Sequence, residues 1–138
     1  MAQQRDPIKI YDAAAQGFRQ RLSGVQANQM SSPTPCTEWD VEALINHNIN
    51  ATGFAEGVFL IDMTRDLLVH TWDLAKGTNQ NTTLDSGLVE VIYHAFAPQM
   101  DGMRQMEFEG IKPMGPEVLV PASASLQDRF IGMMGRQP

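Results

Sequence analysis

The sequence is poor in the residues that would place it in several common classes of protein. It has one cysteine, so no internal disulfide can form, and this is typical of a reducing compartment. The sequence has ten basic residues and sixteen acidic ones, which gives a net charge of −6. A chain with this charge lacks the basic surface that neutralises phosphates, so we expect no nucleic-acid binding.

Long apolar runs are also lacking. Nowhere do about 18 apolar residues follow one another, and the N-terminal residues have no apolar region of signal-peptide length. We therefore expect no membrane association and a cytoplasmic location. At 138 residues, the chain has the size of a single domain, residues 1–138, with one hydrophobic core.

What the sequence does contain is helical periodicity, because apolar residues recur at spacings of three and four along most of its length. This predicts an all-α protein. Asp6 before Pro7 is a helix start, and Gly77 and Pro98 are stops. The four helices predicted in this way span residues 7–27, residues 37 or 40 to the glycines at 53 and 57, residues 58–77, and residues 85–98.

The chain changes character beyond about Asp101. Residues 107–125 are rich in glycine and proline around one apolar run, residues 118–120, which we interpret as irregular or at best one edge strand. A last short helix is predicted over residues 127–134, ending at Gly135.

A set of imidazole and carboxylate groups is concentrated between residues 47 and 73. On a helix, Asp66, His70 and Asp73 project from one face, and His47 approaches from the preceding helix. Helical bundles build metal sites in this way, and three protein ligands leave a position open for water or a thiolate. The predicted ligands of a divalent metal, zinc or nickel, are His47, Asp66 and His70.

Simpler interpretations exist for the same residues. The two histidines and the carboxylate are also compatible with ordinary hydrogen bonds. Asp73 could be a fourth ligand, but one turn beyond His70 it fits better as an acceptor that orients an imidazole. Cys36 lies in a loop without a neighbouring His–Asp arrangement in the sequence, so we interpret it as a small buried residue rather than a reactive thiol.

Four separated motifs carry a family resemblance: PTPCTEWD at 33–40, NH at 46–47, DLLVHTWDLA at 66–75 and DRFIGMMGRQP at 128–138. With these motifs the chain resembles the mycothiol-dependent maleylpyruvate isomerase family, and more closely a metal-binding branch of it, within the DinB-like superfamily of four-helix bundles. The resemblance implies a metal, usually zinc, on His47, Asp66 and His70. It also implies activation of a low-molecular-weight thiol such as mycothiol for isomerase or transferase chemistry on a small electrophile.

One segment of the family pattern is missing. In the family a further bundle helix separates the two ligand motifs, whereas His47 and His70 are only 23 residues apart here. We therefore expect a DinB-like bundle shortened by one central helix. The alternative function is a metal-binding or oligomerisation module that has lost catalytic activity together with that helix.

The missing helix also bears on assembly. It would leave apolar surface uncovered around His47 and Asp66, so we expect a homodimer. A tight hairpin near residue 55 would offset His47 and His70 by ~10 Å along the helix axis. The expectation is therefore either a turn nearer residues 57–60, or a site in which His47 of one chain meets Asp66 and His70 of the other.

Overall fold

The computed structural model describes residues 6–51, 60–112 and 114–138, and throughout these ranges the regular structure is helical. Two isolated β-bridges, Pro33 with Asp40 and Phe108 with Ile111, are the exceptions. The prediction of an all-α protein is confirmed. The chain forms two compact units, Met1–Leu88 and Val89–Pro138, which are described separately.

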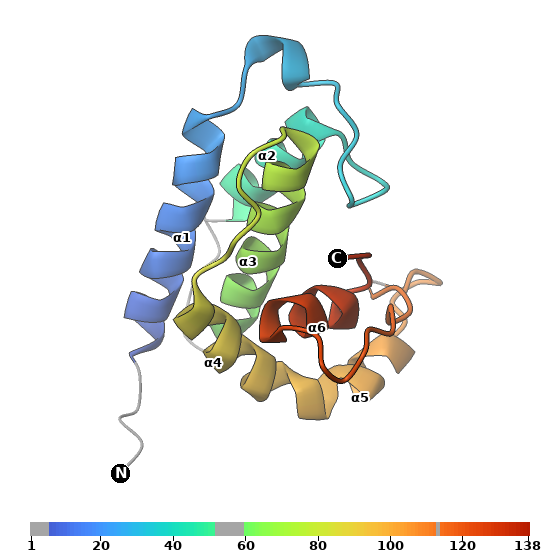
Figure 1. Ribbon diagram of the computed structural model, residues 1–138. Coiled ribbons are helices and arrows are strands. Elements are labelled where there is room, and N and C mark those ends of the chain that lie inside the picture. The colour runs from blue at the N-terminus through green and yellow to red at the C-terminus, as the bar shows by residue number, and fades with distance from the viewer. Residues whose placement is uncertain (1–5, 52–59, 113) are drawn as a thin grey trace. The chain divides into compact units, whose positions relative to one another are not determined.

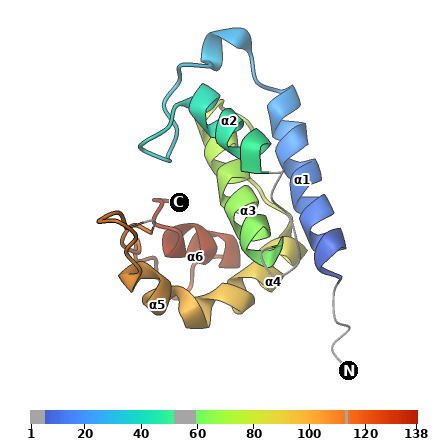
Figure 2. The same cartoon turned by 180° about the vertical axis from the view of Figure 1, so that it is seen from behind.

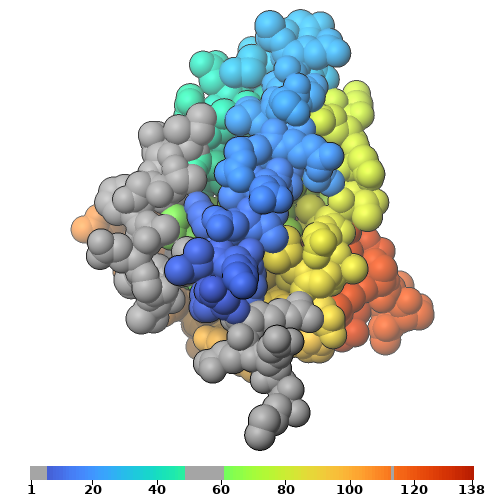
Figure 3. Space-filling model, turned by 90° about the vertical axis from the view of Figure 1, so that its left-hand side faces the viewer, coloured from blue at the N-terminus to red at the C-terminus, as the bar shows by residue number. Residues whose placement is uncertain are grey.

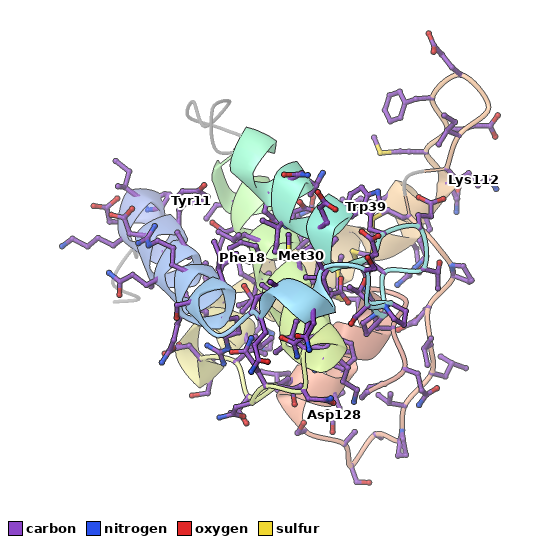
Figure 4. The ribbon with its side chains drawn as sticks, turned by 90° about the horizontal axis from the view of Figure 1, so that it is seen from above. Tyr11, Phe18, Met30, Trp39, Lys112 and Asp128 are labelled. Atoms are coloured by element: carbon purple, nitrogen blue, oxygen red, sulfur yellow. The ribbon has the colours of Figure 1, made fainter. Side chains whose placement is uncertain are left out.

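The first unit is built on three helices, α1 (Pro7–Ser23), α2 (Val41–Ala51) and α3 (Leu60–Gly77). Helices α1 and α3 lie against each other and run in the same direction, and α2 packs on α3 in the opposite direction (Figures 1 and 2). Seen from above, Phe18 points from α1 towards the interior of this unit (Figure 4). The apolar residues of the unit that are most completely buried are Ala14, Val41, Leu44, Val69, Leu74 and Ala75.

Helix α1 begins where the sequence predicts and ends earlier. The side chain of Asp6 accepts a hydrogen bond from the Ile8 N–H at 3.0 Å, and Pro7 occupies the first helical position. The helix stops at Ser23 rather than near residue 27, because the Gly24 N–H caps the carbonyls of Arg21 and Leu22 and the chain then turns into the short 3₁₀ helix η1, Ala27–Gln29.

Helix α2 uses Asp40 rather than Thr37 as its start, since the Asp40 side chain accepts a hydrogen bond from the Ala43 N–H at 2.9 Å. The two glycines predicted to weaken its end lie outside the described residues, as does the predicted start of the third helix at Val58. Helix α3 ends at Gly77, as predicted.

Helix α4 (Ser86–Phe96) is capped by Asp85, whose side chain accepts from the Leu88 N–H at 2.9 Å. The second unit then contains the 3₁₀ turn η4 (Ala97–Gln99), α5 (Met100–Gln105) and α6 (Leu126–Met133). Helix α5 was not predicted. Only six residues long, it follows the break at Pro98 and buries Met100.

The segment between α5 and α6 is irregular, as predicted, and residues 118–120 form no strand there. The Val118 N–H instead donates to the carbonyl of Gly132 in α6 at 2.9 Å. The apolar run therefore packs along a helix, which removes the edge-strand interpretation. Helix α6 starts at Ser125, whose hydroxyl accepts from the Asp128 N–H at 3.1 Å, and Gly135 follows its end with a φ of 82°.

Candidate metal centre

The structure brings His47, Asp66 and His70 together within one chain. Nε2 of His47 on α2 lies 2.9 Å from Oδ2 of Asp66 on α3, and Nε2 of His70 lies 3.4 Å from the other oxygen, Oδ1, of the same carboxylate. One ligand atom from each residue lies within 4.8 Å of the others. The carboxylate thus bridges two imidazoles that come from facing helices.

The cluster forms within one chain, whereas the hairpin for which the offset was argued lies outside the described residues. That argument counted only backbone positions along the axis. Side chains on a helix lean towards its N-terminus, so His47 on α2 and His70 on the oppositely directed α3 lean towards each other. Asp66, one turn closer to the connection than His70, bridges the remaining distance, and no exchange between chains is needed.

Asp73 fixes the orientation of His70. Its side chain is completely buried, and its Oδ2 lies 2.9 Å from Nδ1 of His70. A carboxylate at this distance accepts a hydrogen bond from Nδ1–H, which leaves the lone pair of the neutral ring on Nε2, directed at Asp66. This is the orienting contact that the spacing of Asp73 predicts.

Trp39 covers the two imidazoles from the loop before α2. Its ring centroid lies 4.3 Å from that of His47 and 5.3 Å from that of His70, and Figure 4 shows the residue beside the start of α2. Trp72, by contrast, is buried in the core with Lys76 over its ring at 5.0 Å. Of the two tryptophans, only Trp39 belongs to the cluster.

The carboxylate of Asp66 and the imidazole of His70 shift each other's pKa values in the direction that favours the charged forms. Burial by itself would raise the pKa of Asp66, but hydrogen bonds from His47 and His70 outweigh it and hold that pKa well below the usual 3.8. Burial would likewise lower the pKa of His70, whereas the contacts with Asp66 and Asp73 raise it above 6.5. Without a metal, the group is therefore an imidazolium–carboxylate pair at mildly acidic pH.

The three residues could hold a divalent metal, since one ligand atom from each lies within 4.8 Å of the other two. Ligands of a tetrahedral zinc at about 2.0–2.2 Å lie roughly 3.3–3.6 Å from one another. The side chains of His47 and Asp66 are 34% and 35% exposed, whereas that of His70 is 5% exposed. The cluster is thus anchored in the interior on one side and open on the other.

A residue that sequence reasoning set aside also lies at this centre. A second group of three possible ligands in the described part of the chain consists of Cys36, His70 and Asp73, again within 4.8 Å of one another. The structure places beside Cys36 the His–Asp pair that its neighbours in the sequence do not supply, because the loop before α2 folds back onto α3. The residues next to Cys36 in the sequence do not reveal that it lies close to His70 and Asp73. The one usable signal was that Cys36 shares a short motif with Trp39, which packs on the imidazoles.

The third histidine lies elsewhere. His94 on α4 makes an edge-on contact with Tyr93, with ring centroids 5.5 Å apart, and it belongs to neither group of possible ligands.

Two of the cavities in the described part of the chain adjoin α3. The smaller, about 130 Å³, reaches Asp66 and is lined by residues of α1, α2 and α3, including Tyr11, Asn48 and Arg65. The larger, about 590 Å³, lies between α1 and residues 83–88, two segments that are seen side by side in Figure 3. It touches Leu68 and Thr71, which face away from Asp66 and His70 around the helix. Of these two cavities, the smaller is therefore the one that adjoins the candidate centre.

The part of the chain that the structure describes is helical and contains residues that could bind a divalent metal. Similar proteins are found in Mycobacterium tuberculosis. The uncharacterized proteins Rv0738 and MT0763 of Mycobacterium tuberculosis, from two strains, are each 26% identical to this chain, over 95% of it and 98% of their own length. No family model matches the chain, and no solved structure matches it significantly.

The length of these alignments is informative. Each spans 185 residues, more than the 138 of this chain, so the relatives carry additional residues opposite gaps in it. In the part of the chain that the structure describes, none of the helices combines the length and apolar character of a membrane span.

Proposed function

We propose that this chain binds a divalent metal through His47, Asp66 and His70. The observation that carries the proposal is the convergence of two Nε2 atoms from facing helices on the two oxygens of one carboxylate. Zinc and nickel suit this mixture of imidazole and carboxylate, and three protein ligands leave one position for an exogenous group.

The other residues of the centre have supporting roles. Asp73 holds the proton of His70 on Nδ1 and so keeps Nε2 available. Trp39 packs against both imidazoles on one side. The exposed edge of His47 and Asp66 is the side from which a small molecule reaches the centre.

We further propose that this small molecule is a low-molecular-weight thiol, such as mycothiol, and that the protein transfers it to, or isomerises with it, a small electrophile. A divalent ion bound here would lower the pKa of such a thiol and so supply a nucleophile at neutral pH. In support, the first unit is helical, as the resemblance requires, and the relatives carry additional residues opposite gaps in this chain.

A second function, a metal-binding module without catalytic activity, has an observation in its favour. The cavity beside Asp66 measures about 130 Å³, whereas ligand pockets usually measure about 300–1,000 Å³. A thiol and an electrophile together fill more than this space, so a chain shortened by one helix could retain the metal without the reaction.

Turnover separates the two functions. The zinc-loaded protein is mixed with mycothiol or a simple thiol and with chlorodinitrobenzene, and the aryl thioether that forms as chloride leaves is followed by absorbance. A catalysed rate that disappears in His70→Ala but persists in His94→Ala supports the transferase. A rate no greater than that of the free thiol, from protein that holds one zinc per chain, supports the inactive module.

A further inference from the structure

A second set of ligands surrounds the same histidine. Cys36, His70 and Asp73 each offer one ligand atom within 4.8 Å of the other two. His70 and Asp73 are buried, whereas Cys36 is half-buried. Thiolate, imidazole and carboxylate are the three protein ligands that zinc uses, and this set is the one in the described residues that includes sulfur.

The loop that carries Cys36 is held firmly in place. The Thr34 hydroxyl is within hydrogen-bonding distance of two carbonyls, those of Cys36 at 3.1 Å and Trp39 at 2.7 Å, and the Trp39 N–H donates to the carbonyl of Cys36 at 2.9 Å. The bridge between Pro33 and Asp40 closes the loop. Cys36 therefore lies beside α3 because the backbone around it is fixed.

The absence of a side chain at Gly77 lets this loop approach α3. A Cβ atom at that position would lie 3.0 Å from the carbonyl oxygen of Pro33 and 3.1 Å from Cγ2 of Thr34. The close approach of the loop to the end of α3 is thus built into both segments, and it places the thiol within reach of the buried His–Asp pair.

We propose that Cys36, His70 and Asp73 form a second cation site, which competes with the site at His47 and Asp66 for the single imidazole of His70. The second site takes thiophilic divalent ions, such as cadmium and zinc, because they accept thiolate ligands more readily than hard cations do. The inference rests on the proposed metal binding by His70. It adds a second site, in which Cys36 and Asp73 are the other two ligands.

Competition follows from the chemistry of the imidazole. A neutral ring has one nitrogen with a lone pair and one that carries a proton. In the first site Nε2 binds the ion, and Nδ1–H donates to Asp73. An ion that binds Asp73 and Cys36 meets Nδ1, the nitrogen that faces Asp73, and the proton then resides on Nε2, where it points at Asp66. Each chain therefore holds one ion, in one site or the other.

Cobalt(II) distinguishes the two sites, because a thiolate ligand gives an intense near-ultraviolet charge-transfer band that imidazole and carboxylate ligands do not. The reduced, metal-free full chain is titrated with cobalt(II) as wild type, Cys36→Ser, His47→Ala, Asp66→Asn and His70→Ala, with helical content checked by circular dichroism. Asp66→Asn removes the first site independently of His47→Ala, in case either variant fails to fold.

The expected results differ for each variant. His47→Ala and Asp66→Asn bind one cobalt per chain with the thiolate band, Cys36→Ser binds one without it, and His70→Ala binds none. Wild type binds one in total.

Several results would overturn this inference. If His47→Ala and Asp66→Asn lack the band while Cys36→Ser still binds, the second site does not exist and the proposed function stands. Two equivalents in wild type would disprove the competition. If instead Cys36→Ser fails to bind while His47→Ala shows the band, the first site is disproved and the second remains.

Discussion

The carboxylate of Asp73 is fully buried one turn beyond His70 and lies 2.9 Å from its Nδ1. Removing it frees the ring of His70 to rotate and to change tautomer. The site of His47, Asp66 and His70 then keeps its three ligands but binds the metal less tightly. We expect Asp73→Ala to weaken zinc affinity by about 10–100-fold, measured by competition with a chromogenic chelator. Asp12→Ala, at an exposed position on α1, is the control and should match wild type.

The pH dependence of the metal-free protein follows from two shifted groups. The raised pKa of His70 stabilises the fold fully below 6.5, and this stability is lost as pH rises through the raised value. The lowered pKa of Asp66 stabilises the fold above 3.8, and that stability is lost as pH falls through the lowered value. The metal-free protein should therefore be most stable from about pH 4 to 6.5.

Urea denaturation in the presence of a chelator tests this expectation. The free energy of unfolding should fall as the pH rises above 6.5, through the raised pKa of His70, and the fall should be smaller in His70→Ala. A wild-type protein that is more stable on the alkaline side would contradict the assignment of the charges. Metal affinity should change in the opposite direction, since binding displaces the proton from His70.

At the scale of elements, Gly132 determines how the segment before α6 can pack. A Cβ at this position would collide with the carbonyl oxygen of Val118 and lie 3.2 Å from Cγ1 of Val120. We expect Gly132→Ala to lower the free energy of unfolding by roughly 1–3 kcal/mol, because backbone has to move. Urea denaturation measures the change.

Gly102→Ala in α5 is the matched control. Nothing lies within 4 Å of a Cβ built there, so the same substitution should raise the stability of the protein by roughly 0.5–1 kcal/mol through its effect on helix propensity. Equal effects of the two alanines would show that the contact with Val118 does not constrain the second unit.

The elements that could be predicted from the sequence are those with a local signal. Asp6, Asp85 and Gly77 marked helix ends correctly, because capping depends on neighbouring residues alone. Helix α5 was missed because six residues hold too little periodicity. Residues 118–120 were misassigned because their hydrogen-bond partner, Gly132, is distant in sequence.

The candidate site divides in the same way. Asp66, His70 and Asp73 share one helix, so their common face could be predicted from spacing, and the family resemblance pointed to His47. The contacts of Cys36 and Trp39 with the centre depend on how a loop folds onto α3, and no local pattern encodes that packing.

At the scale of the whole molecule, the predicted homodimer needs a different physical basis from the one the sequence suggested. The described apolar side chains of α2 and α3 that were expected to need cover, such as Leu44, Leu67 and Leu74, are buried within the chain. The large apolar side chains that are exposed in the described residues include Met106, Phe108 and Ile111, which share one short segment of the second unit.

Sedimentation equilibrium measures the assembly. We expect wild type to sediment with twice the 15.3 kDa mass of the chain. If that segment forms the interface, the double variant Phe108→Ser, Ile111→Ser should be a monomer. Ile8→Ser, at a residue of α1 that is similarly exposed, serves as the control. A wild-type protein that sediments as a monomer at micromolar concentration would contradict the dimer.

The metal content of the purified protein tests the central claim most directly. Inductively coupled plasma mass spectrometry should find one divalent ion per chain in wild type and in His94→Ala, whose histidine lies outside both groups of ligands. His70→Ala should contain none, because both groups include that residue. Equal metal content in wild type and His70→Ala, or a wild type that binds no zinc or nickel when they are supplied, would contradict the account.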